Sequence, residues 1–250
     1  MDQKPSLQKS QLKILLLQIR NETLTRQEEH VSFARYSGLR LDQIDILNVF
    51  DTPQFSPQVL DGYDALMVGG SSEANVLKPE TNPFLESCRA LMRSAVTRQL
   101  PTFASCFGHQ LAVQALGGEV VHDETDFEMG TVPIGLRPAA ASDLLYHDTP
   151  DQFLAISVHQ QRSATAPEGC TELAWTDNCC HSFKVDRAPF WTFQFHPEVD
   201  KQTLIDRLTL FREKYTRDSD HLQQVLDNAV ETPESNVLVG KFIDRAVLRL

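Results

Sequence analysis

The sequence predicts an α/β protein built on a three-layer open sheet that is mostly parallel, with some antiparallel strands. In the first half of the chain, short apolar stretches of strand length alternate with stretches of helical character. That alternation is typical of a parallel sheet covered by helices on both faces. In residues 119–195 the segments are short, rich in valine, threonine and aromatic residues, and separated by turns. This second pattern favours antiparallel pairing.

The strands expected in the first half follow one another closely. Four apolar or mixed stretches are expected to form them, in the order Leu12–Ile19, Ile44–Phe50, Ala65–Gly70 and Thr102–Ala104. Between the last two, Asn82 and Pro83 fit a helix N-cap followed by proline at the first helical position. The sequence therefore predicts a helix that begins there and ends near Arg98.

After residue 195 the pattern becomes helical. Lys201–Tyr215 has amphipathic spacing, and two further helical stretches are His221–Val230 and Ser235–Leu250. We expect an N-terminal tail at residues 1–11, one domain at residues 12–215 and a helical extension at residues 216–250. The apolar stripe of the last stretch is expected to pack on the chain's own sheet, with docking of another protein as the alternative.

Composition excludes several classes of function. The 250 residues include 34 acidic and 23 basic side chains, for a formal net charge of −11. Such a surface repels phosphate backbones and anionic lipid, so we expect no nucleic-acid partner and no membrane partner. No apolar run has the length of a signal peptide or a membrane span. The five cysteines are then expected to be reduced thiols, and the expected location is cytoplasmic.

Neither a metal site nor a cofactor site is expected. The eight histidines are scattered along the chain, and no HExxH or CxxC motif occurs. The phosphate-gripping pattern GxxxxGK[ST] is also missing. Packing or solvated roles are expected for His109 and His159, and Cys179 and Cys180 are expected to be bystander thiols.

A candidate nucleophile lies in the segment Pro101-Thr-Phe-Ala-Ser-Cys106-Phe-Gly-His-Gln110. An apolar strand ends at a small residue, a cysteine follows, and a helix begins after Gly108. Small residues two before and two after the cysteine, Ala104 and Gly108, fit the tight turn of a nucleophile elbow. A cysteine at a helix N-terminus is stabilised as thiolate. A buried cysteine that only packs is the competing interpretation, and spacing alone does not decide between the two.

A second segment favours a catalytic role for Cys106. Trp191-Thr-Phe-Gln-Phe-His196-Pro-Glu198-Val199 is a strand that ends at a histidine, with a glutamate two residues later. A thiol nucleophile needs a base, and the base needs an orienting carboxylate. His196 and Glu198, with Pro197 between them, fit these two roles.

Taken together, these segments resemble the class I glutamine amidotransferases. The resemblance rests on Cys106-Phe-Gly-His-Gln110, Ala115-Leu-Gly-Gly118 and Phe195-His-Pro-Glu-Val199, with support from Glu128-Met-Gly130. It covers roughly residues 12–215. Ser157-Val-His159-Gln-Gln and the segment from Pro167 to Cys179 are similar to the glutaminase part of GMP synthase. The resemblance implies a flavodoxin-like fold.

The resemblance also implies roles for single residues. Cys106 would attack the glutamine γ-carbonyl, His196 would act as base and then acid, and Glu198 would orient His196. The oxyanion hole would consist of backbone N–H groups of Gly70 and Phe107. The α-amino and α-carboxylate groups of the substrate would be held by Gln110 and by backbone around Val158 and Gln160.

The sequence departs from the family pattern at two positions. Ala104 stands two residues before the nucleophile, where the family usually has glycine, and this methyl group is expected to be tolerated at the elbow, with a shift of the loop as the possible consequence. Ser71 stands where proline usually follows the glycine-rich strand, so a less rigid oxyanion loop is expected.

The resemblance leaves three functions open. The leading interpretation is a glutaminase that supplies ammonia to a separate synthetase, with glutamine as substrate. The second is a free-standing hydrolase or peptidase that acts on γ-glutamyl conjugates. The third is a non-catalytic regulatory relative, which the intact triad disfavours. A synthetase or a second copy of the chain is the expected protein partner.

Overall fold

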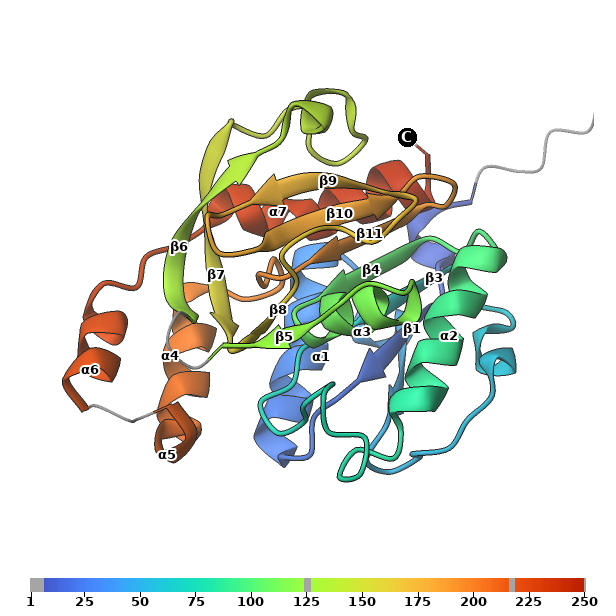
Figure 1. Cartoon of the computed structure of the whole chain (residues 1–250). Helices are drawn as coiled ribbons and strands as arrows, with labels where there is room; N and C mark the ends of the chain where they lie inside the picture. Colours follow the sequence, from blue (N-terminus) through green and yellow to red (C-terminus); the bar gives the residue numbers. More distant parts are fainter. Residues whose placement is uncertain (1–6, 124–126, 216–218, 250) are drawn as a thin grey trace, which may run out of the picture.

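The computed structural model describes residues 7–123, 127–215 and 219–249. Within these residues, nine strands form one mixed sheet in the spatial order β2-β1-β3-β4-β11-β10-β9-β6-β7, and β5 and β8 form a separate pair (Figure 1). The strands of the large sheet are β1 Ile14–Gln18, β2 Ile44–Asn48, β3 Ala65–Val68, β4 Thr102–Ser105, β6 Glu128–Leu136, β7 Gln152–His159, β9 Cys170–Trp175, β10 Cys180–Val185 and β11 Phe190–Phe193. The short pair is β5 Val121–His122 and β8 Gln161–Arg162.

Strand direction divides the large sheet into two parts. From β2 to β11 every neighbouring pair is parallel. From β11 through β10, β9 and β6 to β7 every pair is antiparallel. Only β10 and β6 therefore run against the other described strands of this sheet. The prediction of a mostly parallel sheet with some antiparallel strands is confirmed.

Helices cover both faces of the sheet, as expected for three layers. On one face, α2 (Leu85–Thr97) and α3 (Phe107–Ala115) contribute their apolar residues to a core with β1, β3 and β4. On the other face, α1 (Thr23–Ser37) and α7 (Pro233–Lys241) do the same. A smaller apolar cluster joins β7 to α4 (Lys201–Leu210) and α6 (Ser219–Asp227). The short helix α5 is Arg212–Tyr215.

The helix after β3 begins later than the sequence predicts. Its first residue is Leu85, and the capping position is Phe84, which makes no side-chain cap. Asn82 instead donates its side-chain amide to the carbonyl oxygens of Asn75 and Lys78, at 3.2 and 2.8 Å. The amide is used to close the preceding loop, so the prediction that Asn82 caps the helix was wrong.

The C-terminal apolar stripe lies in the core. After α7 the chain continues as a π-helical turn, Phe242–Val247. Leu238, Val239, Phe242 and Ile243 are fully buried against the sheet and α1. The stripe thus packs on the chain's own sheet, as expected. Residues 1–6 of the expected tail and residues 216–218 at the expected start of the extension lie outside the described residues.

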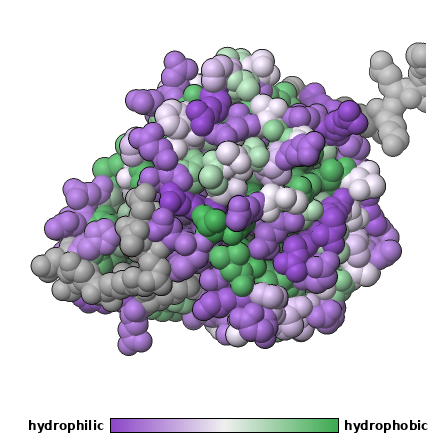
Figure 2. All heavy atoms as spheres, in the orientation of Figure 1, coloured by the Kyte–Doolittle hydropathy of each residue, from purple (hydrophilic) through white to green (hydrophobic). Residues whose placement is uncertain are grey.

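The view in Figure 2 shows a largely hydrophilic face with a smaller hydrophobic area near its centre. In the described part of the chain, no helix combines the length and the apolar character needed to cross a membrane.

Two adjacent parallel strands determine where the site lies. β4 and β11 are in register from Phe190 opposite Thr102 to Phe193 opposite Ser105. The rings of Phe103 and Phe193 stack with centroids 4.4 Å apart and hold the strands together. The segments that follow the two strands therefore emerge side by side at the carboxyl edge of the sheet, where open α/β sheets bind ligands.

Candidate active site

Cys106 occupies a strained turn between β4 and α3. Its backbone has φ 48° and ψ −100°, a conformation that side chains other than glycine rarely adopt. The Cys106 N–H donates to the Phe193 carbonyl at 2.7 Å, and the Gly108 N–H donates to the Gly69 carbonyl at 3.2 Å. The neighbouring strands thereby hold the thiol at the N-terminus of the helix.

The small residues around Cys106 have different functions in packing. A Cβ on Gly108 would lie 2.9 Å from the Val68 carbonyl oxygen, so the helix can approach β3 only without a side chain there. Ala104 is fully buried in β4, and the elbow forms with its methyl group in place.

His196 and Glu198 form a buried pair beside the thiol. Nδ1 of His196 lies 2.7 Å from Oε1 of Glu198, and the two residues are 5% and 0% exposed. The His196 ring and the Cys106 side chain both lie against the backbone of Gly70. The Cys106 thiol contacts the Val158 carbonyl oxygen at 3.8 Å. The structure thus brings together the three residues that the sequence predicted for the triad.

Electrostatics in this pair favour a charged imidazole. Burial lowers the pKa of His196, but the negative charges of Cys106 and Glu198 outweigh burial and raise this pKa to about 9. Burial raises the pKa of Glu198, yet the nearby His196 brings it below the usual value. An imidazolium next to a sulfur nucleophile can protonate a leaving amine.

Asn236 holds the segment that carries His196. Its side-chain amide donates to the carbonyl oxygens of Pro197 and Val199, at 2.8 and 2.9 Å. Asn236 lies in α7, near the end of the chain, and is 8% exposed. This residue was not predicted from the sequence, because a single asparagine within an apolar stripe gives no signal of a distant partner.

Gly70 and Phe107 both face the nucleophile. A Cβ on Gly70 would lie 2.7 Å from Cε1 of His196 and 3.5 Å from Cβ of Cys106, so the Gly70 backbone lies against both side chains. Phe107 is the first residue of α3, where backbone N–H groups have no partner within the helix. Ser71 accepts hydrogen bonds from the N–H groups of Glu73 and Ala74, at 3.2 and 3.0 Å. The serine closes this loop, whereas a less rigid loop was expected.

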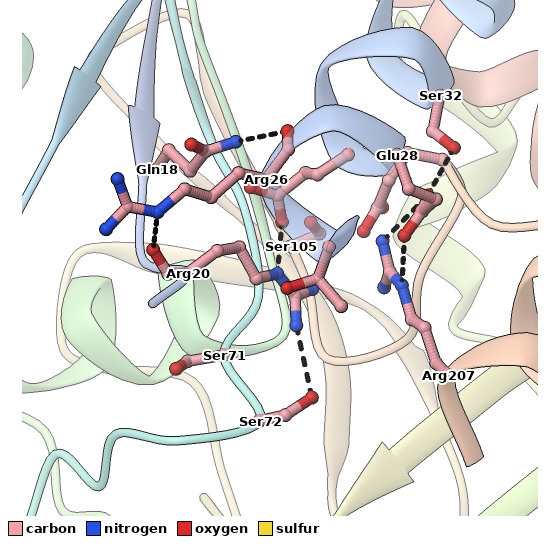
Figure 3. A network of polar contacts seen from close by, with 12 residues as sticks. Gln18, Arg20, Arg26, Glu28, Ser32, Ser71, Ser72, Ser105 and Arg207 are labelled. Carbon is pink, nitrogen blue, oxygen red and sulfur yellow. Dashed lines mark hydrogen bonds and ion pairs between the residues drawn. The ribbon is translucent and has the colours of Figure 1, made fainter. Parts of the chain in front are cut away.

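A buried ion pair lies behind the glycine loop and was not predicted. Nε of Arg20 lies 2.9 Å from Oε1 of Glu29, with side chains 2% and 0% exposed. Nη1 of Arg20 donates to Ser72 at 3.2 Å (Figure 3). A Cβ on Gly69 would lie 2.4 Å from Oε1 of Glu29, so the carboxylate occupies the space that any side chain would need. In the sequence, only the adjacent glycines Gly69 and Gly70 could indicate that another side chain approaches the backbone here.

A pocket opens at the nucleophile. It is lined by Ser71, Ala74, Cys106, Phe107, Gln110, Val158, His159, Gln160 and Gln161. The predicted substrate-binding residues therefore meet in one place. Gln110 is only 3% exposed and donates its amide to the Gln161 carbonyl at 2.9 Å. Its amide nitrogen thus also fixes the short strand that borders the pocket.

One group of side chains has the composition of a metal site. Ligand atoms of Glu128, His159, Cys179 and His181 all lie within 4.8 Å of one another. No histidine cluster was expected from the sequence, because these residues are far apart in the chain. The sheet gathers them from separate segments.

Comparison with known proteins agrees with the geometry. Residues 43–213 match the family model described as Glutamine amidotransferase class-I. The chain is 31% identical over 119 residues to a subunit of the glutamine-hydrolyzing GMP synthase of Methanocaldococcus jannaschii, covering 47% of this chain and 61% of the relative. It is also 31% identical over 110 residues to the glutamine-hydrolyzing GMP synthase of Borreliella burgdorferi, covering 44% of this chain and 21% of that relative. The chain thus matches less than two thirds of either relative's length.

Solved structures share the fold. A glutamine amidotransferase from Thermotoga maritima has a TM-score of 0.75 and 17% identity, with 94% of this chain and 98% of the other covered. A glutamine amidotransferase from Methylobacillus flagellatus has a TM-score of 0.66 and 20% identity, with 95% and 92% covered.

Proposed function

Because the chain belongs to the class I glutamine amidotransferase family, we propose that it hydrolyses the side-chain amide of glutamine and releases ammonia. The observation that carries the proposal is the elbow at Cys106, with φ 48° and the buried His196–Glu198 pair beside it. A strained nucleophile at a helix N-terminus next to a base with an oriented ring is the arrangement that covalent acyl transfer needs.

The proposed reaction has two halves. The Cys106 thiolate attacks the amide carbon of glutamine, and the developing oxyanion accepts hydrogen bonds from backbone N–H groups of Gly70 and Phe107. The carbon–nitrogen bond breaks, His196 protonates the departing nitrogen, and ammonia leaves a γ-glutamyl thioester on sulfur. Water then attacks the thioester as His196 takes its proton. Glutamate departs and the thiolate is restored.

Glu198 and Asn236 serve the proposed reaction by holding His196. Glu198 accepts from Nδ1, which leaves Nε2 for proton transfer toward the substrate. Asn236 fixes the carbonyl oxygens on both sides of Glu198, so the carboxylate does not turn away. Gln110, Val158 and Gln160 line the pocket at Cys106, where they would hold the α-amino and α-carboxylate groups of glutamine.

The proposed recipient of the ammonia is a separate synthetase. Supporting this, one relative is named as a subunit of a glutamine-hydrolyzing GMP synthase. Ammonia in water at neutral pH is mostly ammonium, which is not nucleophilic. Direct transfer to an acceptor enzyme would deliver the ammonia before it is protonated. Homo-oligomerisation is the alternative protein partnership.

A γ-glutamyl conjugate is the second candidate substrate, favoured by a hollow on another side of His196. This hollow is lined by Arg20, Ser71, Ser72, Ile156, Val158, His196, Val199, Leu204, Arg207 and Leu208. The guanidinium group of Arg20 lies on this wall, and its Nη2 makes no hydrogen bond within the described residues. Because Nη2 is buried and the hollow holds about one water molecule, Arg20 would act on a carboxylate-bearing leaving group through its charge and not by direct contact, whereas ammonia would not need this cation.

The test compares release of glutamate from glutamine and from γ-glutamylglycine. We expect glutamine to be cleaved faster, and the Cys106→Ala variant to lose about 10⁶-fold in kcat, as found for comparable nucleophiles. Cys180→Ser is the matched control, because its buried thiol contacts the Ser182 carbonyl rather than the pocket. The Cys106→Ala variant should also resist labelling by a diazoketone analogue of glutamine.

Four results would overturn parts of the proposal. Normal turnover by Cys106→Ala would show that Cys106 is not the nucleophile. Preference for γ-glutamylglycine would show that a γ-glutamyl conjugate, and not glutamine, is the substrate. Hydrolysis of glutamine at about 10 per second without any partner, which is typical of a complete enzyme, would remove the need for a synthetase. No hydrolysis of either substrate, with or without a synthetase, would favour a regulatory relative.

A further inference from the structure

Four potential metal ligands meet at one end of the antiparallel half of the sheet. Glu128 is the first residue of β6 and lies directly opposite His159, the last residue of β7. His181 belongs to β10, and Cys179 precedes that strand. All four residues are buried, with exposures of 8%, 6%, 0% and 4% for Glu128, His159, His181 and Cys179.

Irregular strand pairing creates this meeting point. β6 pairs with β9 only through Gly135 and Leu136, so the start of β6 extends past the end of β9. The β9–β10 register shifts between Cys180 and Ser182, which places His181 at a bulge. Bulges redirect side chains and are common next to functional sites. Here the redirected side chain reaches the carboxylate of Glu128.

The contacts inside the cluster leave donor atoms unused. Oε2 of Glu128 lies 3.0 Å from Nε2 of His159 and 2.7 Å from Nε2 of His181. Within the described residues, neither ring nitrogen of His181 makes an aligned hydrogen bond, and neither does Nδ1 of His159. Although Nε2 of His181 lies 2.7 Å from Oε2 of Glu128, the N–H direction of the ring does not point at that oxygen. Buried polar atoms without partners are costly and need an explanation.

A neighbouring hydroxyl group orients the carboxylate. Thr176 donates to Oε1 of Glu128 at 2.7 Å, and Oε2 faces the two imidazoles and accepts a longer hydrogen bond from Ser157 at 3.4 Å. Metal-binding carboxylates and imidazoles are usually held in this way by hydrogen bonds from outside the site.

We propose that Glu128, His159, Cys179 and His181 form a structural zinc site. Zinc prefers four ligands of nitrogen, sulfur and oxygen type, and ligand atoms in such a tetrahedron lie about 3.3–3.8 Å apart. The two short contacts to Glu128 must open by about 0.5 Å to reach this spacing. All four ligand atoms already lie within 4.8 Å of one another. Imidazole and thiolate ligands select zinc over magnesium or calcium.

Charge balance supports a divalent ion in this buried place. One carboxylate and one thiolate neutralise the two charges of zinc, and the imidazoles are neutral. Binding breaks the S–H bond of Cys179, forms a zinc–sulfur bond and releases one proton to solvent. The turn from Thr176 to Cys179 lies at the surface, because Asp177 within it is exposed.

The site stabilises a strand that borders the active site. His159 follows Val158, whose carbonyl oxygen contacts the Cys106 thiol. A metal bound to His159 would fix the end of β7 without touching the reacting atoms. Its role is therefore structural, and glutamine hydrolysis proceeds through the triad.

The test measures metal binding, with Cys106→Ala as the background so that the nucleophile cannot hold added metal. After exposure to zinc and removal of the excess, we expect about one zinc per chain, as for a closed four-ligand site. Titration with Co²⁺ should produce a thiolate-to-cobalt charge-transfer band. Cys179→Ser should abolish the band, and His181→Ala should weaken binding more than about 100-fold, because even residues that only hold a metal ligand by a hydrogen bond contribute about 10–100-fold.

Cys180→Ser in the same background is the matched control and should keep both the zinc and the band. Retention of no zinc by the background chain would overturn the proposal, and this measurement does not depend on how any ligand variant folds. A charge-transfer band that survives Cys179→Ser would overturn it equally. Zinc should raise the melting temperature of the background chain and leave that of Cys179→Ser unchanged.

Discussion

Replacing Gly70 by alanine tests whether catalysis depends on the space beside His196. The new Cβ would lie 2.7 Å from Cε1 of His196 and 3.5 Å from Cβ of Cys106. Carbon atoms in contact are about 3.5–4.0 Å apart, so the imidazole must move by about 1 Å. A displacement of about 1 Å at a reacting group costs about 10²-fold in rate. We therefore expect kcat/KM for glutamine to fall about 100-fold.

Gly240→Ala is the matched control, because it makes the same change at a site without this contact. A Cβ on Gly240, in α7, would lie 3.4 Å from the Tyr36 carbonyl oxygen, near ordinary contact distance. Alanine is also favoured over glycine inside a helix by about 1 kcal/mol. The control should keep its activity and melt no lower than the wild-type chain.

Two assays separate the cause of the expected loss. Steady-state release of glutamate gives kcat/KM, and the rate of labelling by a diazoketone analogue of glutamine reports the reactivity of Cys106. Both rates should fall together in Gly70→Ala while the melting temperature changes little, because the obstructing atom belongs to a side chain. Wild-type turnover in Gly70→Ala would refute the claim that Gly70 shapes the site.

Three further predictions concern charge. The pKa of His196 is raised to about 9, so kcat/KM should fall as pH rises through about 9 and the imidazolium is lost. The same raised pKa adds to the free energy of unfolding. This contribution is complete below the usual histidine pKa of about 6.5 and is lost as pH rises through about 9. Glu198→Gln removes one of the raising charges, so the alkaline fall should move to lower pH with a loss of about 10⁴-fold in kcat, and an unmoved profile would contradict the pairing. Glu29→Ala should lower the free energy of unfolding by about 3–5 kcal/mol, because it leaves Arg20 buried and unpaired. Denaturant unfolding measures this loss, and Glu86→Ala, whose side chain is 69% exposed, should cost about 1 kcal/mol or less.

The sequence predicted those parts of the site that lie within short segments. Cys106 and Gly108 follow one strand, and His196 and Glu198 follow another, so local spacing was sufficient to identify each segment. Their meeting required only that β4 and β11 be neighbours, and parallel strands expose their carboxyl ends at one edge. The fold class was accessible for the same reason, because alternation of strands and helices is a local pattern.

Residues that act across the fold could not be predicted in this way. Arg20 and Glu29 meet behind Gly69, and Asn236 reaches the His196 segment from α7. Each of these contacts depends on tertiary packing that no periodicity records. His181 depends on a register shift between β9 and β10, and a bulge changes which face a side chain occupies. The spacing of the histidines along the chain therefore did not indicate the cluster around Glu128, which forms only in the folded sheet.

The two halves of the sheet divide the proposed work. The strained backbone conformation of Cys106 is maintained by hydrogen bonds to the carbonyl oxygens of Phe193 and Gly69, which lie in or beside the parallel strands. Val158, Gln160 and the cluster around Glu128 belong to the antiparallel strands or their connections. Apart from Gln110 in α3, the proposed binding groups lie on one half and the bond-breaking groups on the other, and the two sets meet where the Val158 carbonyl contacts the Cys106 thiol. A change confined to the antiparallel half then acts mainly on KM, because it moves the substrate, while a change at the elbow acts on kcat, because it moves the nucleophile.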